Sequence, residues 1–223
     1  MSDKHNTNAN KDKDKVIIIG LTGSYAMGKS TASAMFQQRG IPVHDADATV
    51  HALLAAGGEG VEAVAQHFPQ TLVHNGASNK SIDRKKLGVE VFADQAKRET
   101  LESIVHPLVQ AKRLAWLDAI KKSESPNTHP LLVVFDIPLL LETGKESLCD
   151  YIVVVSAPKW VQEKRALARD GMDLSRLKNI LLRQMADADK QKRADYIIPT
   201  QFGITASAWY IDRILADIRL CHA

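Results

Sequence analysis

The sequence contains little cysteine, few aromatic residues and no long hydrophobic run. Of its 223 residues, 5% are Phe, Trp or Tyr, and Cys149 and Cys221 are the two cysteines. Two widely separated cysteines provide neither a disulfide framework nor a zinc-type cluster, which is typical of proteins in the reducing cytoplasm. No apolar run approaches the ~20 residues that span a bilayer. We therefore expect a cytoplasmic protein without a membrane partner.

The first fifteen residues are polar and rich in Asn, Lys and Asp. They lack the apolar core of a secretory signal and the amphipathic pattern of a transit peptide. Residues 1–15 are therefore predicted to form a disordered leader.

The charge is close to balanced, with a net charge of +3, and its distribution is uneven. The segment from Glu163 to Arg193 contains nine Lys or Arg residues and five Asp or Glu residues, so its net charge is +4 and that of the remainder is about −1. A basic surface of this kind suits a polyphosphate ligand, although a solvated helical face accounts for most of these residues. Because no aromatic residues are interleaved there for stacking on bases, we expect no nucleic-acid partner.

Apolar stretches alternate with helical patterns along the chain. The predicted strands are Val16–Ile19, Ile41–His44, Leu131–Phe135, Tyr151–Val155 and Tyr196–Ile198. The predicted helices are Lys29–Arg39, Ala48–Ala56, Gly60–His67, Arg84–Phe92, Gln95–Lys122, Lys159–Arg169, Leu174–Ala188 and Ile204–Leu220. Nearly all-apolar strands alternating with helices indicate a three-layer α/β/α fold around a five-stranded parallel sheet.

The long helical stretch between the second and third strands predicts a separate subdomain. We assign 16–47 and 126–223 to the core, 48–125 to a helical insertion, and about 169–193 to a helical lid within the core. The insertion follows the carboxyl edge of the sheet, where ligands of such sheets bind.

Residues Gly23 to Thr31 read G-S-Y-A-M-G-K-S-T, which fits the phosphate-binding loop G-x-x-x-x-G-K-[ST]. An apolar strand leads in and a helix pattern begins at Lys29, which is the context that gives the motif its meaning. Backbone N–H groups and the helix dipole hold phosphate in such a loop. Lys29 would then reach the β- and γ-phosphates, and the Ser30 hydroxyl would ligate Mg²⁺.

The loop specifies nucleotide binding without specifying a reaction. A GTPase needs N-K-x-D, but Asn79 and Lys80 are followed by Ser and Ile. A motor or transport ATPase needs a catalytic glutamate beside the acid that ends the third strand, whereas Asp136 is followed by Ile and Pro. A small-molecule kinase remains.

Such a kinase needs an acid facing the acceptor hydroxyl and arginines that close over the transferring phosphoryl group. Asp45 and Asp47 follow the second predicted strand, at the same sheet edge as the loop. One of the two is expected to cap the next helix, and the other is free to orient the hydroxyl. Arg169 stands at the break between two predicted helices, the layout of a lid.

The chain resembles the dephospho-CoA kinase family over nearly its whole length past residue 15. The segments that carry the resemblance are Gly20–Thr31, Gly40–Asp47, Asp83–Gly88, Leu101–Pro107, Asp136–Gly144, Arg169–Asp170 and Ala194–Ile198. The ordered set with D-A-D, H-P and P-L-L is far more specific than the loop alone.

The resemblance implies ATP-dependent phosphorylation of the ribose 3′-hydroxyl of dephospho-CoA, the last step of coenzyme A synthesis. Catalysis would involve Asp47 facing the acceptor, Lys29 on the phosphates and Arg169 in the lid. The residues expected to contact ATP are Gly23, Ala26, Met27, Gly28, Lys29, Ser30, Thr31 and Arg169. Those expected to contact the acceptor are Asp47, Arg84, His106 and Pro107. A partly buried structural role is an equal alternative for His106.

We expect Asp136 to support the loop or Mg²⁺ water, and Glu142 to be structural. Oligomeric state is open between a monomer and a weak homo-oligomer.

The loop departs from the pattern G-G-I-G-S-G-K-S usual in the family, because Ser24 and Ala26 replace glycines. We expect neither position to need a positive φ, because the replacements are small. The bulk of Tyr25 and Met27 is expected to point away from the phosphates.

Two alternatives to the acceptor assignment come from other classes. Another phosphate-loop kinase, for a nucleoside monophosphate or a small alcohol, would share the loop and the lid. A nucleotide-sensing module that never turns over would share the loop, but it has no need of an acceptor-facing acid.

Overall fold

A computed structural model describes residues 16–74, 76, 79–123 and 130–222. The predicted leader and most of the turn-rich link before residue 130 lie outside the described residues. The chain divides into two compact units, one holding the residues up to His44 with those from Ser123 onward, the other holding Asp45–Lys122. Asp47 therefore belongs to the second unit.

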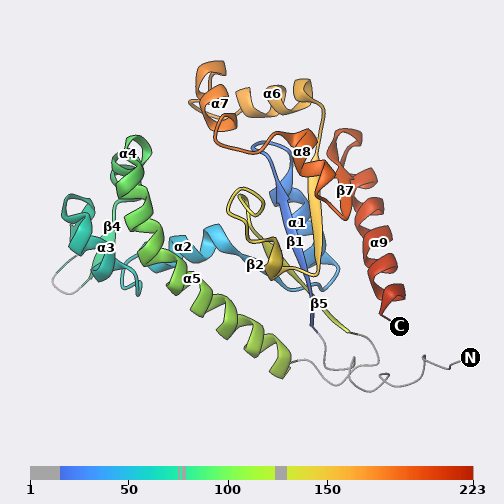
Figure 1. Ribbon diagram of the computed structural model, residues 1–223, viewed down its shortest axis with the longest axis horizontal. Coiled ribbons are helices and arrows are strands. Elements are labelled where there is room, and N and C mark those ends of the chain that lie inside the picture. The colour runs from blue at the N-terminus through green and yellow to red at the C-terminus, as the bar shows by residue number, and fades with distance from the viewer. Residues whose placement is uncertain (1–15, 75, 77–78, 124–129, 223) are drawn as a thin grey trace, which may run out of the picture. The chain divides into compact units, whose positions relative to one another are not determined.

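The first unit contains a five-stranded sheet with the order β2-β5-β1-β6-β7. Its strands are β1 (Val16–Gly23), β2 (Val43–Asp45), β5 (Leu131–Asp136), β6 (Tyr151–Ser156) and β7 (Tyr196–Pro199). The pairs β1–β5, β1–β6 and β6–β7 are parallel, with Ile19 opposite both Val134 and Tyr151. The predicted five-stranded parallel fold is confirmed, and the phosphate-loop sequence follows its central strand (Figure 1).

Helices of the first unit complete its layers. They are α1 (Lys29–Gln38), α6 (Lys159–Leu167), α7 (Leu174–Leu181), α8 (Asp187–Lys192) and α9 (Ile204–Cys221). Helix α9 contacts β7 and α1 (Figure 1). Phe36 of α1, Ile17 of β1 and Ile211 of α9 are wholly buried in one cluster, so this face of the sheet is covered by the apolar sides of two helices.

The second unit is mostly helical. It contains α2 (Ala46–Leu54), α3 (Val61–His67), α4 (Arg84–Ala93) and α5 (Gln95–Ser123), whose last residue passes into the first unit. A two-stranded antiparallel sheet joins β3 (Leu72–His74) to β4 (Lys80–Ile82). The core of this unit packs Leu54, Val64, Phe68, Leu87 and Val105 together.

The structure differs from the sequence prediction at several local points. The pattern Leu174–Ala188 breaks into α7 and α8, because the backbone at Met185 donates a hydrogen bond to the Glu142 side chain rather than continuing a helix. Helix α2 begins at Ala46 instead of Ala48, since the Asp45 carboxylate accepts the Ala48 N–H at 2.9 Å and caps it. The strands β3 and β4 were not predicted, because three residues are too few for a clear alternation.

Within the described part of the chain, none of the helices is both long enough and apolar enough to cross a membrane.

Candidate active site

The loop from Gly23 to Thr31 connects β1 to α1 through two residues in the left-handed region. Gly28 has φ 98° and is the residue before the first turn of α1, where such a φ favours glycine. Gly23 is required for a different reason. A Cβ built there would lie 2.3 Å from Val155 Cγ2 and 2.8 Å from the Val155 oxygen, so the close approach of β1 to β6 excludes a side chain.

Ala26 corrects one expectation about this loop. It has φ 61°, and it is the one non-glycine residue with a positive φ in the described part of the chain. The expectation that position 26 does not need this conformation was therefore wrong, while Ser24 does not share it. Left-handed backbone costs a residue with a Cβ roughly 1–2 kcal/mol. Ala26 is held there by packing, since it is 7% exposed and contacts Ala166 and Leu177.

Lys29 at the start of α1 is paired within the first unit. Its ammonium donates to the carboxylate of Asp136, which ends β5 and is 2% exposed. The expected role of Asp136 in supporting the loop is confirmed by this pair. Ser30 and Thr31 are exposed in the same first helical turn. The amino group that would meet phosphate is thus located by a buried carboxylate at the end of the neighbouring strand.

The loop is also tied to the segment after β7. Thr200 Oγ1 donates to the Met27 carbonyl at 2.7 Å, and Arg165 donates from two guanidinium nitrogens to Thr200 Oγ1 and O, both at 2.8 Å. Met27 itself is 2% exposed in the core, as expected for a side chain turned away from a ligand. A buried hydrogen-bond chain therefore runs from α6 through Thr200 to the loop backbone.

Two glutamines hold the backbone at Tyr25. Gln184 Oε1 accepts the Tyr25 N–H at 2.9 Å, and Gln162 Nε2 donates to the Tyr25 carbonyl at 2.8 Å. Gln162 belongs to α6 and Gln184 follows α7. The backbone at Tyr25 is therefore held by α6, which precedes the predicted lid, and by a residue within the predicted lid.

Arg169 lies in the turn between α6 and α7, where the sequence placed it. Its Cζ atom is 4.7 Å from the centroid of the Tyr25 ring, and its side chain is exposed. Helix α7 begins after Asp173, whose carboxylate accepts the Arg176 N–H at 2.7 Å. The arginine thus lies over the loop, within the same unit as Lys29.

Glu142 has the structural role expected of it. Its Oε1 accepts the Met185 N–H at 2.9 Å and lies 2.7 Å from Lys190 Nζ. The Lys190 side chain is wholly buried and that of Glu142 is 13% exposed. This ion pair anchors the chain between α7 and α8 to the segment that follows β5.

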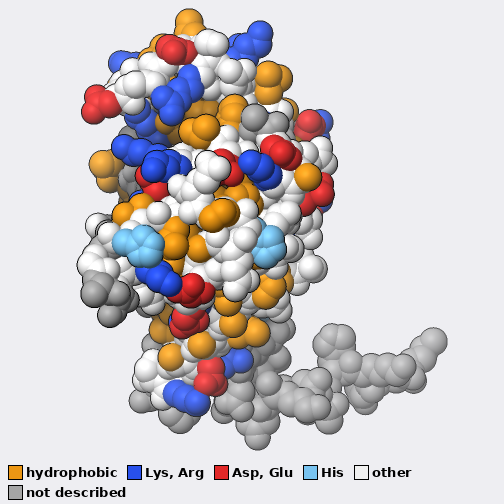
Figure 2. Space-filling model, turned by 90° about the vertical axis from the view of Figure 1, so that its left-hand side faces the viewer, with side chains coloured by type: hydrophobic (Ala, Val, Ile, Leu, Met, Phe, Trp, Pro, Cys, Tyr) orange, Lys and Arg blue, Asp and Glu red, His pale blue; other side chains and the backbone are white. Residues whose placement is uncertain are grey.

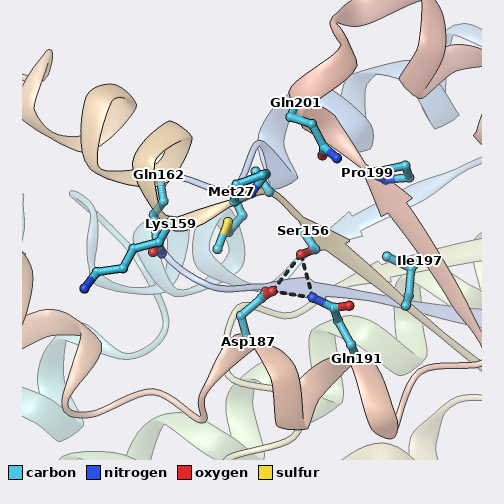
Figure 3. A pocket seen from close by; sticks show the side chains of 11 residues that line it. Met27, Ser156, Lys159, Gln162, Asp187, Gln191, Ile197, Pro199 and Gln201 are labelled. Carbon is cyan, nitrogen blue, oxygen red and sulfur yellow. Dashed lines mark hydrogen bonds between the residues drawn. The ribbon is translucent and has the colours of Figure 1, made fainter.

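A cavity of about 530 Å³ opens beside Met27 (Figure 3). On one wall Ser156 Oγ donates to Asp187 Oδ2 at 2.6 Å, and Gln191 Nε2 donates to the same oxygen at 2.6 Å. Figure 3 shows Lys159 and Gln162 on the α6 side of the cavity and Pro199 and Gln201 on the β7 side. The space next to the loop is therefore lined by polar groups from four elements.

The candidate acceptor residues of the second unit are exposed. Asp45 is used as the cap of α2, whereas Asp47, in the first turn of that helix, makes no hydrogen bond or ion pair with a described residue. Arg84 begins α4. His106 and Pro107 lie inside α5 and are both exposed.

Comparison with known proteins decides the family. A model of the family described as dephospho-CoA kinase matches residues 17–205. The chain belongs to the dephospho-CoA kinase family. It is similar to the dephospho-CoA kinase of Paramagnetospirillum magneticum, with 52% identity over 174 residues, which is 78% of this chain and 77% of that protein.

The fold is shared with solved structures. The structure of TT1252 from Thermus thermophilus is 30% identical, has a TM-score of 0.75 and covers 91% of this chain and 98% of its own. The dephospho-CoA kinase from Campylobacter jejuni is 25% identical, has a TM-score of 0.59 and covers 92% of this chain and 98% of its own.

In this member of the dephospho-CoA kinase family, sequence reasoning missed Gln162, Arg165, Gln184 and Thr200. Arg165 had been counted in the basic segment between Glu163 and Arg193, which also contains Gln184. No pattern in the sequence reveals these contacts, because they join residues 35 to 173 positions apart.

Proposed function

We propose that this protein transfers the γ-phosphoryl group of ATP to the ribose 3′-hydroxyl of dephospho-CoA, giving coenzyme A and ADP. This is the last step of coenzyme A synthesis. The observation that carries the proposal is the loop between β1 and α1, with Lys29 paired to Asp136 and Arg169 above it, in a chain matched by the dephospho-CoA kinase family. The reaction needs positioning and neutralisation of charge more than covalent chemistry.

ATP would bind with its phosphates in the loop. Gly28 and Ala26, both with positive φ, turn the backbone so that successive N–H groups can face an anion. Lys29 would exchange its contact with Asp136 for phosphate oxygens, so ATP binding must compete with this ion pair. Gly23, Met27, Ser30, Thr31 and Arg169 complete the proposed contacts.

Ser30 would hold Mg²⁺ with the ATP phosphates, and the nearby Asp136 carboxylate suits its water ligands. An exposed hydroxyl in the first turn of α1 fits an ion that keeps most of its water and takes few protein oxygens. The described residues contain no group of three or more His, Cys, Asp or Glu that could form a site without the nucleotide. Bound there, the ion would neutralise charge on the β- and γ-phosphates.

The second unit would bind the acceptor. Asp47 would accept a hydrogen bond from the attacking hydroxyl, because its carboxylate has no described partner, whereas Asp45 is occupied as a helix cap. Arg84, His106 and Pro107 would contact the remainder of dephospho-CoA. The expected nucleotide domain of 16–47 and 126–223 and acceptor domain of 48–125 differ from the two compact units by a few residues, since the second unit already begins at Asp45. Residues 169–193 would form the lid.

Lid closure would exclude water from the γ-phosphate, since an open site would hydrolyse ATP without transfer. We also propose that the protein acts in the cytoplasm as a monomer or weak homo-oligomer. Figure 2 shows one face of the molecule, where basic side chains alternate with acidic and hydrophobic ones, which is the pattern of a solvated surface.

The deciding experiment measures ADP release with ATP and each of dephospho-CoA, AMP, CMP and shikimate, followed by mass spectrometry of the product. We expect turnover with dephospho-CoA and a product carrying one added phosphate at the 3′ position. Turnover with another acceptor and none with dephospho-CoA would show that the protein is a different phosphate-loop kinase. ATP binding without turnover of any acceptor would favour the sensing module.

A further inference from the structure

The position of Arg169 depends on an aromatic ring of the loop. The guanidinium lies 4.7 Å from the centroid of the Tyr25 ring. The Arg169 side chain makes no hydrogen bond or ion pair with any residue in the described part of the chain, and it is exposed. Among the described residues, the ring of Tyr25 is therefore the contact that positions this guanidinium.

Tyr25 provides a fixed surface rather than a mobile one. Its N–H and its carbonyl are both engaged, by Gln184 at 2.9 Å and by Gln162 at 2.8 Å. The ring packs against a buried cluster formed by Ala26, Ala166 and Leu177. A ring attached to a backbone held on both sides loses little further entropy when a cation stacks on it.

The same cluster joins the loop to α6 and α7, the helices on either side of Arg169. Ala166 belongs to α6 and Leu177 to α7, and both contact Ala26, whose φ of 61° places its methyl group in this cluster. Tyr25 and Ala26 are two of the positions at which the loop departs from G-G-I-G-S-G-K-S, and both pack against the helices that flank Arg169. An isoleucine at position 25 would offer no aromatic face to a cation.

Stacking leaves the chemistry of the arginine available. A guanidinium on an aromatic face uses its plane for the contact, while its N–H donors remain directed outward in that plane. Those donors suit phosphate oxygens, which accept such bonds in a bidentate manner. The ring belongs to the loop that would hold the phosphates, so a stacked Arg169 lies next to the proposed site.

We propose that Tyr25 is a positioning residue for the reaction: its ring holds the Arg169 guanidinium over the phosphate-binding loop before ATP binds. This inference rests on the proposed function, in which Arg169 contacts the ATP phosphates. It predicts that Tyr25 acts through Arg169 and has no effect on ATP once that arginine is removed.

The test measures the dissociation constant of ATP with Mg²⁺ by titration calorimetry, without an acceptor. Tyr25→Ile should weaken ATP binding by about two- to fivefold, the size of an exposed cation–π contact. Tyr25→Phe, which keeps the ring, should bind ATP with the wild-type dissociation constant. In an Arg169→Ala background, Tyr25→Ile should cause no further loss, because the two residues act as one unit.

Trp209→Leu is the matched control. Trp209 on α9 also carries a stacked arginine, Arg213, at 5.7 Å from its ring centroid, and this pair is remote in the chain from the loop. Its removal should leave ATP binding unchanged. Thermal melts of all variants, followed by circular dichroism, establish that each is folded at the temperature of the titration.

Three outcomes would overturn the inference. They are wild-type affinity in Tyr25→Ile, an equal loss in Tyr25→Phe, or the same loss from Tyr25→Ile with and without Arg169. Since the titration contains no acceptor, a wild-type protein that binds ATP but does not phosphorylate dephospho-CoA would contradict the proposed acceptor and leave this inference intact.

Discussion

The two compact units differ in whether their candidate functional residues are held by other side chains. Around the loop of the first unit, Tyr25, Met27 and Lys29 are each held by a side chain from another element. In the second unit, Asp47 and Arg84 are exposed and make no hydrogen bond or ion pair with a described residue. The proposed nucleotide site is therefore held by the protein's own side chains, whereas these two proposed acceptor residues have no such support in the described residues. Four predictions test this contrast.

The largest effect is expected at Asp47. Asp47→Asn should lower phosphoryl transfer by on the order of 10⁴, because the acceptor hydroxyl loses its base, while ATP affinity stays unchanged. Steady-state kinetics with dephospho-CoA and ATP titration measure the two quantities. Asp45→Asn is the matched control, since Asn also caps helices and activity should be retained. Transfer that survives in Asp47→Asn would move the role to Asp45 or Asp136.

Removal of the lid arginine should have the next largest effect. Arg169→Ala should reduce turnover by on the order of 10²–10³, as loss of one charge-stabilising donor does elsewhere. The same kinetic assay measures it, with Arg213→Ala on α9 as a stacked arginine outside the site. Turnover within a few-fold of the wild type would remove Arg169 from the proposed mechanism.

The buried pair behind the lid tests whether the first unit is preorganised by its core. Lys190→Met leaves the Glu142 carboxylate buried without its cation, and it should lower the free energy of unfolding by about 3–5 kcal/mol. Urea denaturation measures this change. Lys192, two residues after Lys190, forms an exposed pair with Asp189, and Lys192→Met should cost less than about 1 kcal/mol. Equal costs would show that burial of the first pair contributes nothing.

The smallest effect is expected at the surface of the first unit. The hydrogen bond from Arg39 holds the pKa of Asp212 below its usual range. A carboxyl whose pKa is lowered on folding stabilises the protein above its unfolded pKa, and this contribution is lost as the pH falls through the folded value. Asp212→Asn should thus lower stability near neutral pH by less than about 1 kcal/mol, since the Asp212 side chain is 60% exposed.

Urea denaturation at neutral and acid pH measures that difference. It should shrink in acid, where the wild-type carboxyl is protonated too. A difference independent of pH would assign the effect to the lost contact geometry rather than to charge.

Much of the fold could be predicted because it depends on local pattern. The apolar strands and the glycine-rich loop before Lys29 are legible as sequence, and the sheet confirms them. The break between α7 and α8 was missed because it depends on Glu142, more than forty residues earlier in the chain. The positive φ of Ala26 was missed because it depends on packing against Ala166 and Leu177, which are distant in the sequence.

The sequence by itself determined the phosphate-binding loop, the parallel α/β architecture and the family, because each depends on residue types at short, regular spacings. The tertiary structure alone decided which groups hold the loop, namely Asp136 on Lys29, Thr200 on Met27 and two glutamines on Tyr25, and that Arg169 lies on the Tyr25 ring. These contacts join segments far apart in the chain. The pairing of β1 with β5 brings Asp136 to Lys29, and the packing of α6 and α7 brings the two glutamines to Tyr25.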